Sequence, residues 1–303
     1  GDSIIVRNNQ LYRNALFGGV CSGTSLVVHG IVSNLLIEGN ILVEDPNAVG
    51  QGCWGISVTP GYTLPEGFAG TIIRGNTIIN VGNASIAVTS VPGCIIENNI
   101  IIQEQANFES NGIALPDRAL GSEDLLDDNA TVRNNTVYFK NSPSGSTGIK
   151  VNPSGANHKV VSNLVYYDGN ADYFNCFNTT GTPAESYDAF DYNLGYFPGA
   201  TLGRWEASTG SLQQWQESTG FDMNSLVQDP LLISPASPDY NTAIPENSPA
   251  VSAGHPTLSS PIDFNGKTRD SNPDIGAIEF FPPTGAEINI SGETQYMLMP
   301  NYR

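Results

Sequence analysis

The sequence predicts an all-β fold in which short strands repeat along the chain. Its 303 residues include 32 Gly and 20 Pro and show no long helical pattern of apolar residues, so turns are frequent. A short motif recurs: two apolar residues, a polar residue, a Gly or Asn, and a final Asn. The copies are Ile5–Asn9, Leu36–Asn40, Ile72–Asn76, Ile95–Asn99 and Thr131–Asn135, and weaker copies end at Asn163 and Asn193. Their irregular intervals predict constant strands joined by variable loops.

Alignment on the final Asn gives each column a physical role. The residue three positions earlier is always apolar and is expected inside: Val6, Ile37, Ile73, Ile96, Val132, Val160 and Phe190. In six of the seven copies the residue just before the Asn is Gly, Asn or Ser, and Gly and Asn tolerate the left-handed backbone of a tight bend. The Asn column itself predicts a ladder in which each side-chain amide bonds its equivalent one coil away.

Charges alternate in the column two positions before the Asn, which reads Arg7, Glu38, Arg74, Glu97 and Arg133. In stacked parallel strands, opposite charges would lie about 4.8 Å apart. An exposed pair contributes only ~0.2–1 kcal/mol. We therefore interpret this column as specifying register rather than supplying stability.

A second strand recurs between the Asn motifs, with apolar residues inside and the intervening residue outside. Its copies are Ser25–His29, Gly55–Thr59, Ser85–Thr89, Gly112–Pro116 and Gly148–Asn152. A third strand follows the Asn, as in Ile100–Ile102. Each coil thus contains three short strands.

Three strands per coil with an Asn bend resemble the right-handed, single-stranded parallel β-helix of the pectate-lyase-like superfamily. The resemblance covers residues 4 to 197, about seven coils. We assign residues 1–197 to the coils; the chain opens on an apolar run without an initiator Met, which leaves room for N-terminal coils before residue 1. The resemblance implies that function lies on the outer face of the first strand, the one reading Gly-Ile-x-Val.

The pattern changes from Pro198 onward. Ser211 is expected to cap a short helix over Leu212–Ser218, with Gly220 as the stop. Together with Asp229-Pro230-Leu231 and Asp274–Glu279, this stretch resembles the closing segment of bacterial secreted β-helix proteins of the "choice-of-anchor" type. Because an open β-helix end must be covered, we expect residues 198–281 to cap the same domain. Residues 282–303 are expected to be a linker or tail leading to an anchor.

Composition excludes several classes of partner. The net charge of −18 disfavours nucleic acid and anionic membranes, both of which depend on Lys and Arg meeting phosphate. No apolar run is long enough to insert into a membrane. Four cysteines allow three full pairings, and free buried thiols are the simpler interpretation.

The candidate catalytic residues are Lys150, Arg118 and Asp117. Lys150 ends the outward column Val27, Ser57, Ala87, Ala114 and Lys150, and the resemblance implies lyases that neutralise a uronate carboxylate and remove the α-proton with Lys or Arg and a partner base. Small residues in the column would let a flat sugar chain approach the sheet. Against this, an outward lysine is more often plain solvated surface, and no lyase or polygalacturonase signature surrounds these residues.

A hydrolase would instead use two carboxylates from the acidic loop, which holds Asp117, Glu123, Asp124, Asp127 and Asp128. No cofactor is required, although Ca²⁺ would suit such oxygen ligands. The loop lacks the spacing of a defined calcium site, and a solvated loop is the commoner interpretation. His29, His158 and the cysteines have no metal-ligand spacing.

Trp54 and Tyr62 are expected to stack sugar rings together with Phe68, and His29 and Asn152 lie in the next outward column. Loop aromatics that pack back onto the coil are the alternative. The sequence therefore predicts a secreted or cell-surface protein that acts on polysaccharide as a lyase or glycoside hydrolase. The alternative is a non-catalytic surface or adhesive β-helix that binds glycan or is structural.

Overall fold

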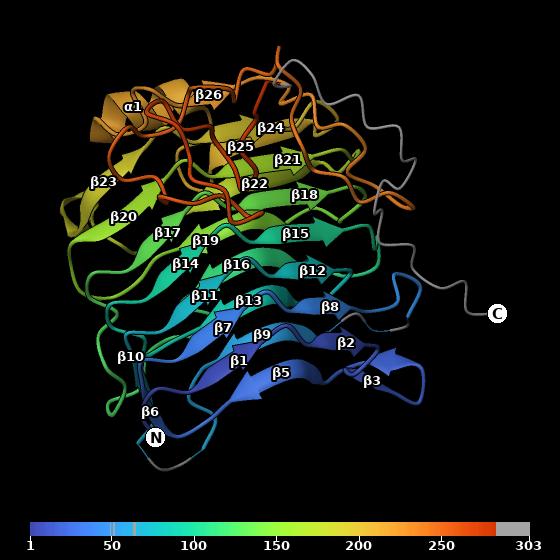
Figure 1. Cartoon of the computed structure of the whole chain (residues 1–303), viewed down its shortest axis with the longest axis vertical. Coiled ribbons are helices and arrows are strands. Elements are labelled where there is room, and N and C mark those ends of the chain that lie inside the picture. The colour runs from blue at the N-terminus through green and yellow to red at the C-terminus, as the bar shows by residue number, and fades with distance from the viewer. Residues whose placement is uncertain (49, 51, 63–64, 283–303) are drawn as a thin grey trace.

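The computed structural model describes residues 1–48, 50, 52–62 and 65–282. It is an all-β structure dominated by three long parallel sheets, which is compatible with a parallel β-helix. The chain visits the three sheets in turn, and Figure 1 shows the strands rising in sequence order from the N-terminus at the bottom. Apart from Pro282, the expected linker or tail lies outside the described residues.

The three sheets are named here by the order of strands within a coil. Sheet 1 contains β5 (Thr24–Val28), β9 (Trp54–Val58), β13 (Ala84–Val88), β16 (Asn111–Leu115), β19 (Thr147–Val151), β22 (Tyr173–Asn178) and β25 (Leu202–Glu206). Sheet 2 contains β1 (Ile5–Arg7), β7 (Leu36–Glu38), β11 (Ile72–Arg74), β14 (Ile95–Glu97), β17 (Thr131–Arg133), β20 (His158–Val161) and β23 (Tyr187–Asp191). Sheet 3 contains β2 (Gln10–Tyr12), β8 (Ile41–Val43), β12 (Thr77–Ile79), β15 (Ile100–Gln103), β18 (Thr136–Phe139), β21 (Leu164–Tyr167), β24 (Leu194–Tyr196) and β26 (Leu226–Val227).

The remaining elements are short. A parallel pair joins β6 (Ile31–Ser33) to β10 (Gly67–Ala69), and a hairpin joins β3 (Leu16–Phe17) to β4 (Val20–Cys21). A 3-10 turn spans Ala184–Ser186, and α1 spans Leu212–Thr219. No helix in the described part of the chain is long and apolar enough to cross a membrane.

The predicted register of sheet 2 is confirmed. Val6 aligns with Ile37, Ile37 with Ile73, and the same alignment continues through Ile96, Val132, Val160 and Phe190, always between parallel strands. From Ile37 onward these side chains are buried in the core. The alternating charges also align: Glu38 pairs with Arg74 and Glu97 with Arg133, each at 2.7 Å.

The motif asparagines form a continuous hydrogen-bonded column at the bend between sheets 2 and 3. Each side-chain Nδ2 donates to the Oδ1 of the next asparagine at 2.9–3.2 Å, and the backbone N–H of the same residue donates to that oxygen as well. The column runs Asn9, Asn40, Asn76, Asn99, Asn135, Asn163, Asn193. From Asn40 onward every member is fully buried. From Asn40 onward each Nδ2 also donates to a strand carbonyl one coil earlier, as Asn99 does to Ile73 at 2.9 Å.

Asp222 and Ser225 end this column. Asn193 Nδ2 donates to Asp222 Oδ1 at 3.1 Å, and its backbone N–H donates to Ser225 Oγ at 2.8 Å. The indole N–H groups of Trp205 and Trp215 donate to Asp222 Oδ2 at 3.0 and 2.8 Å. Burial raises the pKa of Asp222 to about 7.

Helix α1 carries Trp215 and forms where the sequence predicts it. Ser211 caps its N-terminus in a capping box with Gln214, because each side chain bonds the other's backbone N–H. Gly220 ends it in the left-handed conformation, with φ of 76°.

The segment expected to cap the coil end divides into two parts. β25, α1 and β26 lie at the C-terminal end of the stack, whereas residues 229–281 run back along its side. In Figure 1 this orange-to-red segment crosses in front of the bend between sheets 2 and 3. It buries the outer face of sheet 3 in a second apolar cluster that includes Ile102, Tyr138, Leu164, Leu194, Leu232, Ile244, Ile275 and Ala277.

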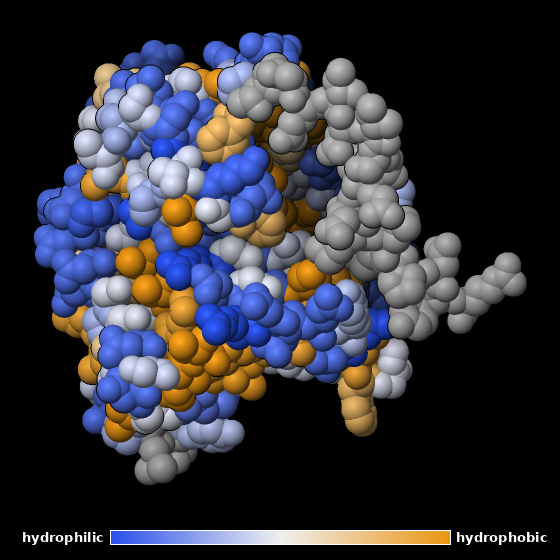
Figure 2. All heavy atoms as spheres, in the orientation of Figure 1, coloured by the Kyte–Doolittle hydropathy of each residue, from blue (hydrophilic) through white to orange (hydrophobic). Residues whose placement is uncertain are grey.

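This returning segment is held by the residues that precede the asparagine column. Asn98 Nδ2 donates to Ser260 Oγ at 2.9 Å, Asn134 Oδ1 accepts from the Ser260 N–H at 2.7 Å, and the Ser162 and Ser259 hydroxyls bond at 2.8 Å. Asn98, Asn134 and Ser162 all have a left-handed φ, between 49° and 58°. In earlier coils the residue just before the column asparagine is a glycine, Gly39 or Gly75. In Figure 2 apolar residues gather over the region of β1, β7 and β11. Ile5, the first residue of β1, is 56% exposed.

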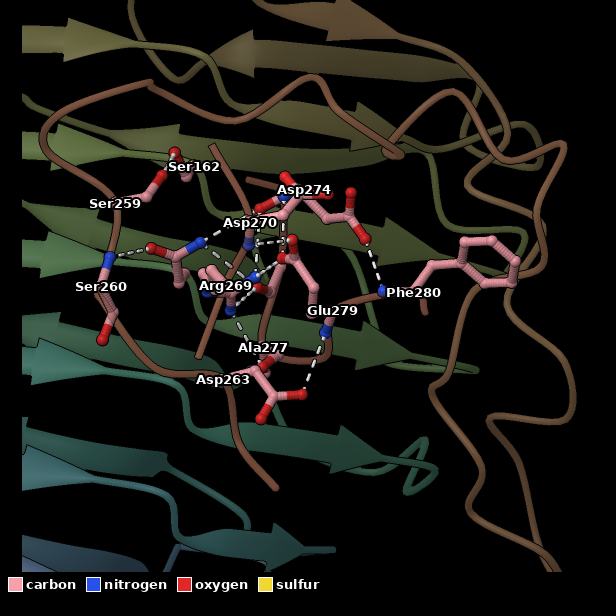
Figure 3. A network of polar contacts seen from close by, with 12 residues as sticks. Ser162, Ser259, Ser260, Asp263, Arg269, Asp270, Asp274, Ala277, Glu279 and Phe280 are labelled. Atoms are coloured by element: carbon pink, nitrogen blue, oxygen red, sulfur yellow. Dashed lines mark hydrogen bonds and ion pairs between the residues drawn. The ribbon is translucent and has the colours of Figure 1, made fainter. Parts of the chain in front are cut away.

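A buried ion pair organises the end of the returning segment (Figure 3). Arg269 pairs with Glu279 at 2.6 Å, and their side chains are only 2% and 1% exposed. Arg269 Nη2 also donates to Asn98 Oδ1 at 3.0 Å, which joins the segment to the coil. Glu279 accepts from the Asp274 N–H at 3.0 Å, and Asp274 accepts from the Phe280 N–H at 2.6 Å.

The expectation of free buried thiols holds for two of the four cysteines and is wrong for the other two. Cys21 and Cys53 form a disulfide with Cα atoms 5.1 Å apart, whereas Cys94 and Cys176 are free and buried. The Gly52 N–H donates to the Cys21 carbonyl at 2.9 Å. The disulfide therefore links two neighbouring segments that a backbone hydrogen bond also joins.

We predict that Arg269→Met lowers the free energy of unfolding by about 3–5 kcal/mol, because Glu279 is left buried and unpaired. Arg13→Met is the control, since the Arg13–Asp45 pair has a similar length of 2.7 Å but Arg13 is 65% exposed. The control should lose less than about 1 kcal/mol. Urea unfolding measures both, and equal losses would contradict a structural role for the buried pair.

We also predict a pH dependence from Asp222. Because its pKa rises from 3.8 to about 7 on folding, the folded protein keeps a proton that the unfolded chain has lost. This group's contribution to stability is therefore full below about pH 4 and is lost as the pH rises through about 7. Asp222→Asn should flatten the fall in melting temperature over this range, while the exposed Asp239→Asn should leave it unchanged. A wild-type slope in Asp222→Asn would refute the assignment.

Candidate functional site

The candidate site lies on the outer face of sheet 1, behind the other two sheets in Figure 1. Register places Val27, Ser57, Ala87, Ala114 and Lys150 in one outward column across successive coils. Loop residues 59–62, 65–66 and 116–128 border this column. Lys150 is half-buried, and its Nζ makes no hydrogen bond or ion pair with any described residue.

Asp117 is held rigidly beside this column. Its carboxylate accepts hydrogen bonds from the hydroxyls of Thr59, at 2.9 Å, and Thr89. Both threonines belong to the second outward column, so each successive coil contributes a partner. Desolvation lowers the pKa of Lys150, and the negative charge of Asp117 acts in the opposite sense. The structure therefore brings Lys150 and Asp117 close enough to interact.

Arg118 joins the two bordering loops. Its Nη1 donates to Asp124 Oδ2 at 2.8 Å and to the Ala119 carbonyl at 2.7 Å, while Nε donates to the Pro60 carbonyl at 3.3 Å. Burial acts to raise the pKa of Asp124, but hydrogen bonds from Arg118 and the Gly121 N–H lower it. Nη2 makes no hydrogen bond with the described residues, so part of the guanidinium stays available.

His29 and Tyr62 form the other side of the site, and a residue that the sequence analysis missed positions them. Glu66 is buried and accepts from the N–H groups of Gly30, Gly61 and Tyr62 at 2.5, 2.6 and 3.1 Å. Its Oε1 lies 3.4 Å from His29 Nδ1. The rings of His29 and Tyr62 are 4.6 Å apart, and Tyr62 is 69% exposed. The one feature of the sequence that could have pointed to Glu66 is its isolated negative charge directly before the apolar segment Gly67–Ala69.

The alanine floor expected under a sugar chain is not accessible. Ala87 and Ala114 are 0% and 2% exposed and form a small apolar cluster with Ala84, against which Trp54 packs. Phe68, expected in a stacking wall, is fully buried in the core. Of the three aromatic residues expected to contact a sugar, Trp54 is partly buried and Tyr62 is exposed.

Asn152 lies beyond Lys150 in the second outward column. Its Nδ2 donates to the Thr180 carbonyl at 2.9 Å, while its Oδ1 is buried and accepts no hydrogen bond from the described residues. The side chain is therefore fixed toward the next coil. Among the described residues, no hydrogen bond joins Asn152 to His29 or Tyr62.

The acidic loop does not converge on one point. Asp127 is buried, accepts from the Val91 N–H at 2.8 Å, and has a pKa raised to about 6 by burial. Asp128 accepts from the Ala156 N–H at 2.8 Å, and Asp124 is bound to Arg118. Within the described ranges, no group of three His, Cys, Asp or Glu side chains is placed to hold a metal ion.

Comparison with known proteins assigns no function to this group of residues. No family model matches the chain, and no curated protein matches it.

Proposed function

We propose that the chain is a right-handed parallel β-helix of about seven coils, with the asparagine column as its ladder, and that it acts on polysaccharide outside the cell or at its surface. We further propose a lyase reaction on the outer face of sheet 1, with Lys150 as the base. Residues 1–197 form the coils in this proposal, and residues 198–281 complete the same domain.

One observation carries the lyase proposal: Lys150 is half-buried, has no ion-pair partner among the described residues, and faces outward beside a fixed carboxylate. A general base must be partly unprotonated to act, and burial lowers the pKa of Lys150 although the charge of Asp117 opposes this, so the lysine loses its proton more easily than an exposed one would. Hydrolysis would need a second carboxylate opposite Asp117. Asp124, Asp127 and Asp128 are held in local hydrogen bonds instead, which favours elimination.

In the proposed reaction, Lys150 Nζ takes the proton from the carbon next to a uronate carboxylate. The electron pair of that C–H bond forms a carbon–carbon double bond, and the bond to the glycosidic oxygen breaks. The leaving oxygen then receives the proton from Nζ, so the lysine returns to its neutral state. Arg118 Nη2 would bind the uronate carboxylate, whose charge grows as the proton leaves.

Substrate binding is proposed to involve Trp54 and Tyr62 as stacking surfaces, with His29 and Asn152 at the two ends. Because the net charge is −18, a polyanionic substrate needs local cations. Lys150 and Arg118 supply two, and Ca²⁺ bridging between protein and substrate carboxylates would add to them. The Cys21–Cys53 disulfide supports an extracellular location, because such bonds persist in oxidising compartments.

Glycan binding without cleavage is the second candidate. It is favoured by the use of Arg118 Nε and Nη1 within the protein, which leaves only Nη2 for a substrate. On this view, sheet 1 would present Trp54, Tyr62 and Lys150 as a rigid binding face. The same candidate includes a surface or adhesive role.

We predict that Lys150→Ala lowers turnover on a uronate polysaccharide at least ~100-fold, the low end for general acid–base groups. The assay follows absorbance of unsaturated products with and without Ca²⁺, and reducing ends report hydrolysis. Lys159→Ala is the matched control, because Lys159 lies on sheet 2 and pairs with Asp188 at 3.2 Å; it should keep wild-type turnover.

Full activity of Lys150→Ala on an identified substrate would overturn the catalytic assignment. Retention of a polysaccharide without any cleavage would replace the lyase with the glycan-binding module. Reducing ends without unsaturated products would show a hydrolase.

A further inference from the structure

A second groove lies on sheet 3, away from the candidate site. It has a volume of about 540 Å³ and is formed between the outer face of β18 and β21 and the returning segment near Leu231–Ala236. Its polar and aromatic lining consists of Tyr138, Lys140, Tyr166, Asp168 and Asp229. Grooves of this size hold small ligands in many proteins.

An aromatic wall follows from the register of sheet 3. Tyr138, Tyr166 and Tyr196 occupy the same position on successive strands, so their rings lie one above another. Neighbouring ring centroids are 5.2 Å apart in both pairs. Tyr166 is partly exposed, and Tyr138 is held by its hydroxyl, which donates to Asp168 Oδ2 at 3.3 Å. The wall is therefore rigid before any ligand binds.

Three charged groups surround this wall without neutralising one another. Lys140 and Asp168 follow β18 and β21, and Asp229 begins the returning segment. No ion pair joins Lys140 to either aspartate among the described residues. Asp229 Oδ1 accepts from the Leu231 N–H at 2.8 Å, and Asp168 Oδ2 accepts from Tyr138, so each carboxylate keeps one oxygen without a described partner.

Two further observations agree with a ligand site here. Leu231, which lines the groove, has a left-handed φ of 57°, which turns the chain at the edge of the groove. Burial raises the pKa of Tyr166 to about 12, with further contributions from the negative charges of Asp168 and Asp229. Both carboxylates therefore act on the face of the groove that carries Tyr166.

We propose that this groove binds a neutral hexopyranose unit of a saccharide. The ring of Tyr166 would take the C–H face of the sugar, the free carboxylate oxygens of Asp168 and Asp229 would accept from hydroxyl groups, and Lys140 would donate to a hydroxyl oxygen. Two carboxylates against one ammonium group disfavour a uronate at this place. The site thus differs from the sheet 1 site in ligand and does not rest on the proposed cleavage.

The test measures binding of neutral hexasaccharides of glucose, mannose and galactose by calorimetry. We expect one of them to bind the wild type, and Tyr166→Ala and Asp168→Asn each to weaken that binding at least about tenfold. Asp168 is exposed, so Asp168→Asn should fold normally. If Tyr166→Ala fails to fold, Asp168→Asn alone still tests the proposal. Tyr12→Ala, at an exposed tyrosine of sheet 3 outside the groove, and Lys150→Ala should bind as the wild type does.

The proposal fails if no neutral hexasaccharide binds the wild type at millimolar concentration, or if Asp168→Asn binds as tightly as the wild type. It also fails if Lys150→Ala alone abolishes binding, because the saccharide would then occupy sheet 1. Loss of cleavage activity in Lys150→Ala with neutral-sugar binding retained would leave both assignments in place.

Discussion

The hydrogen-bonded asparagine column is the interaction on which the rest of the structure depends. At every bend between sheets 2 and 3 the backbone turns sharply and leaves polar groups facing inward, where no water can satisfy them. One asparagine per coil satisfies them, since its amide donates to a strand carbonyl and to the next asparagine while its oxygen accepts two N–H groups. Asp222, held by two tryptophans, ends this series inside the protein, so the last asparagine is not left without a partner.

Because the asparagine column lies inside the protein, the side chains on the outer faces of the sheets can make other contacts. The residues just before the column asparagines project outward, and in the later coils Asn98, Asn134 and Ser162 use this position to bind the returning segment. That segment covers sheet 3 and creates the groove beside Tyr166. The segment does not cover sheet 1, and the loops that carry Asp117 and Glu66 border the outer face there. The two proposed sites thus arise from one scaffold in two different ways.

Features that recur in every coil could be predicted from the sequence. Features that depend on a single contact between distant residues could not. The alignment of Val6, Ile37 and Ile73 and the pairing of Glu38 with Arg74 follow from column positions, and helix α1 follows from Ser211 and Gly220. The path of residues 229–281 did not, because it depends on single contacts such as that of Arg269 with Asn98, distant in sequence. The same reason applies to Glu66, whose partners Gly30 and Gly61 carry no side-chain signal. Ala87 and Ala114 were expected to be open because burial by Trp54 cannot be read from their own strands.

Removal of one member of the column tests this account most directly. Asn99→Ala leaves the Ile73 carbonyl, the Asn76 amide and the Asn135 oxygen short of partners, and each such loss costs roughly 1–3 kcal/mol. Urea unfolding of Asn99→Ala should therefore show a loss of at least about 2 kcal/mol, whereas Asn170→Ala, at an exposed loop asparagine, should lose less than about 0.5 kcal/mol. Equal stability of the two variants would contradict a structure that depends on this column.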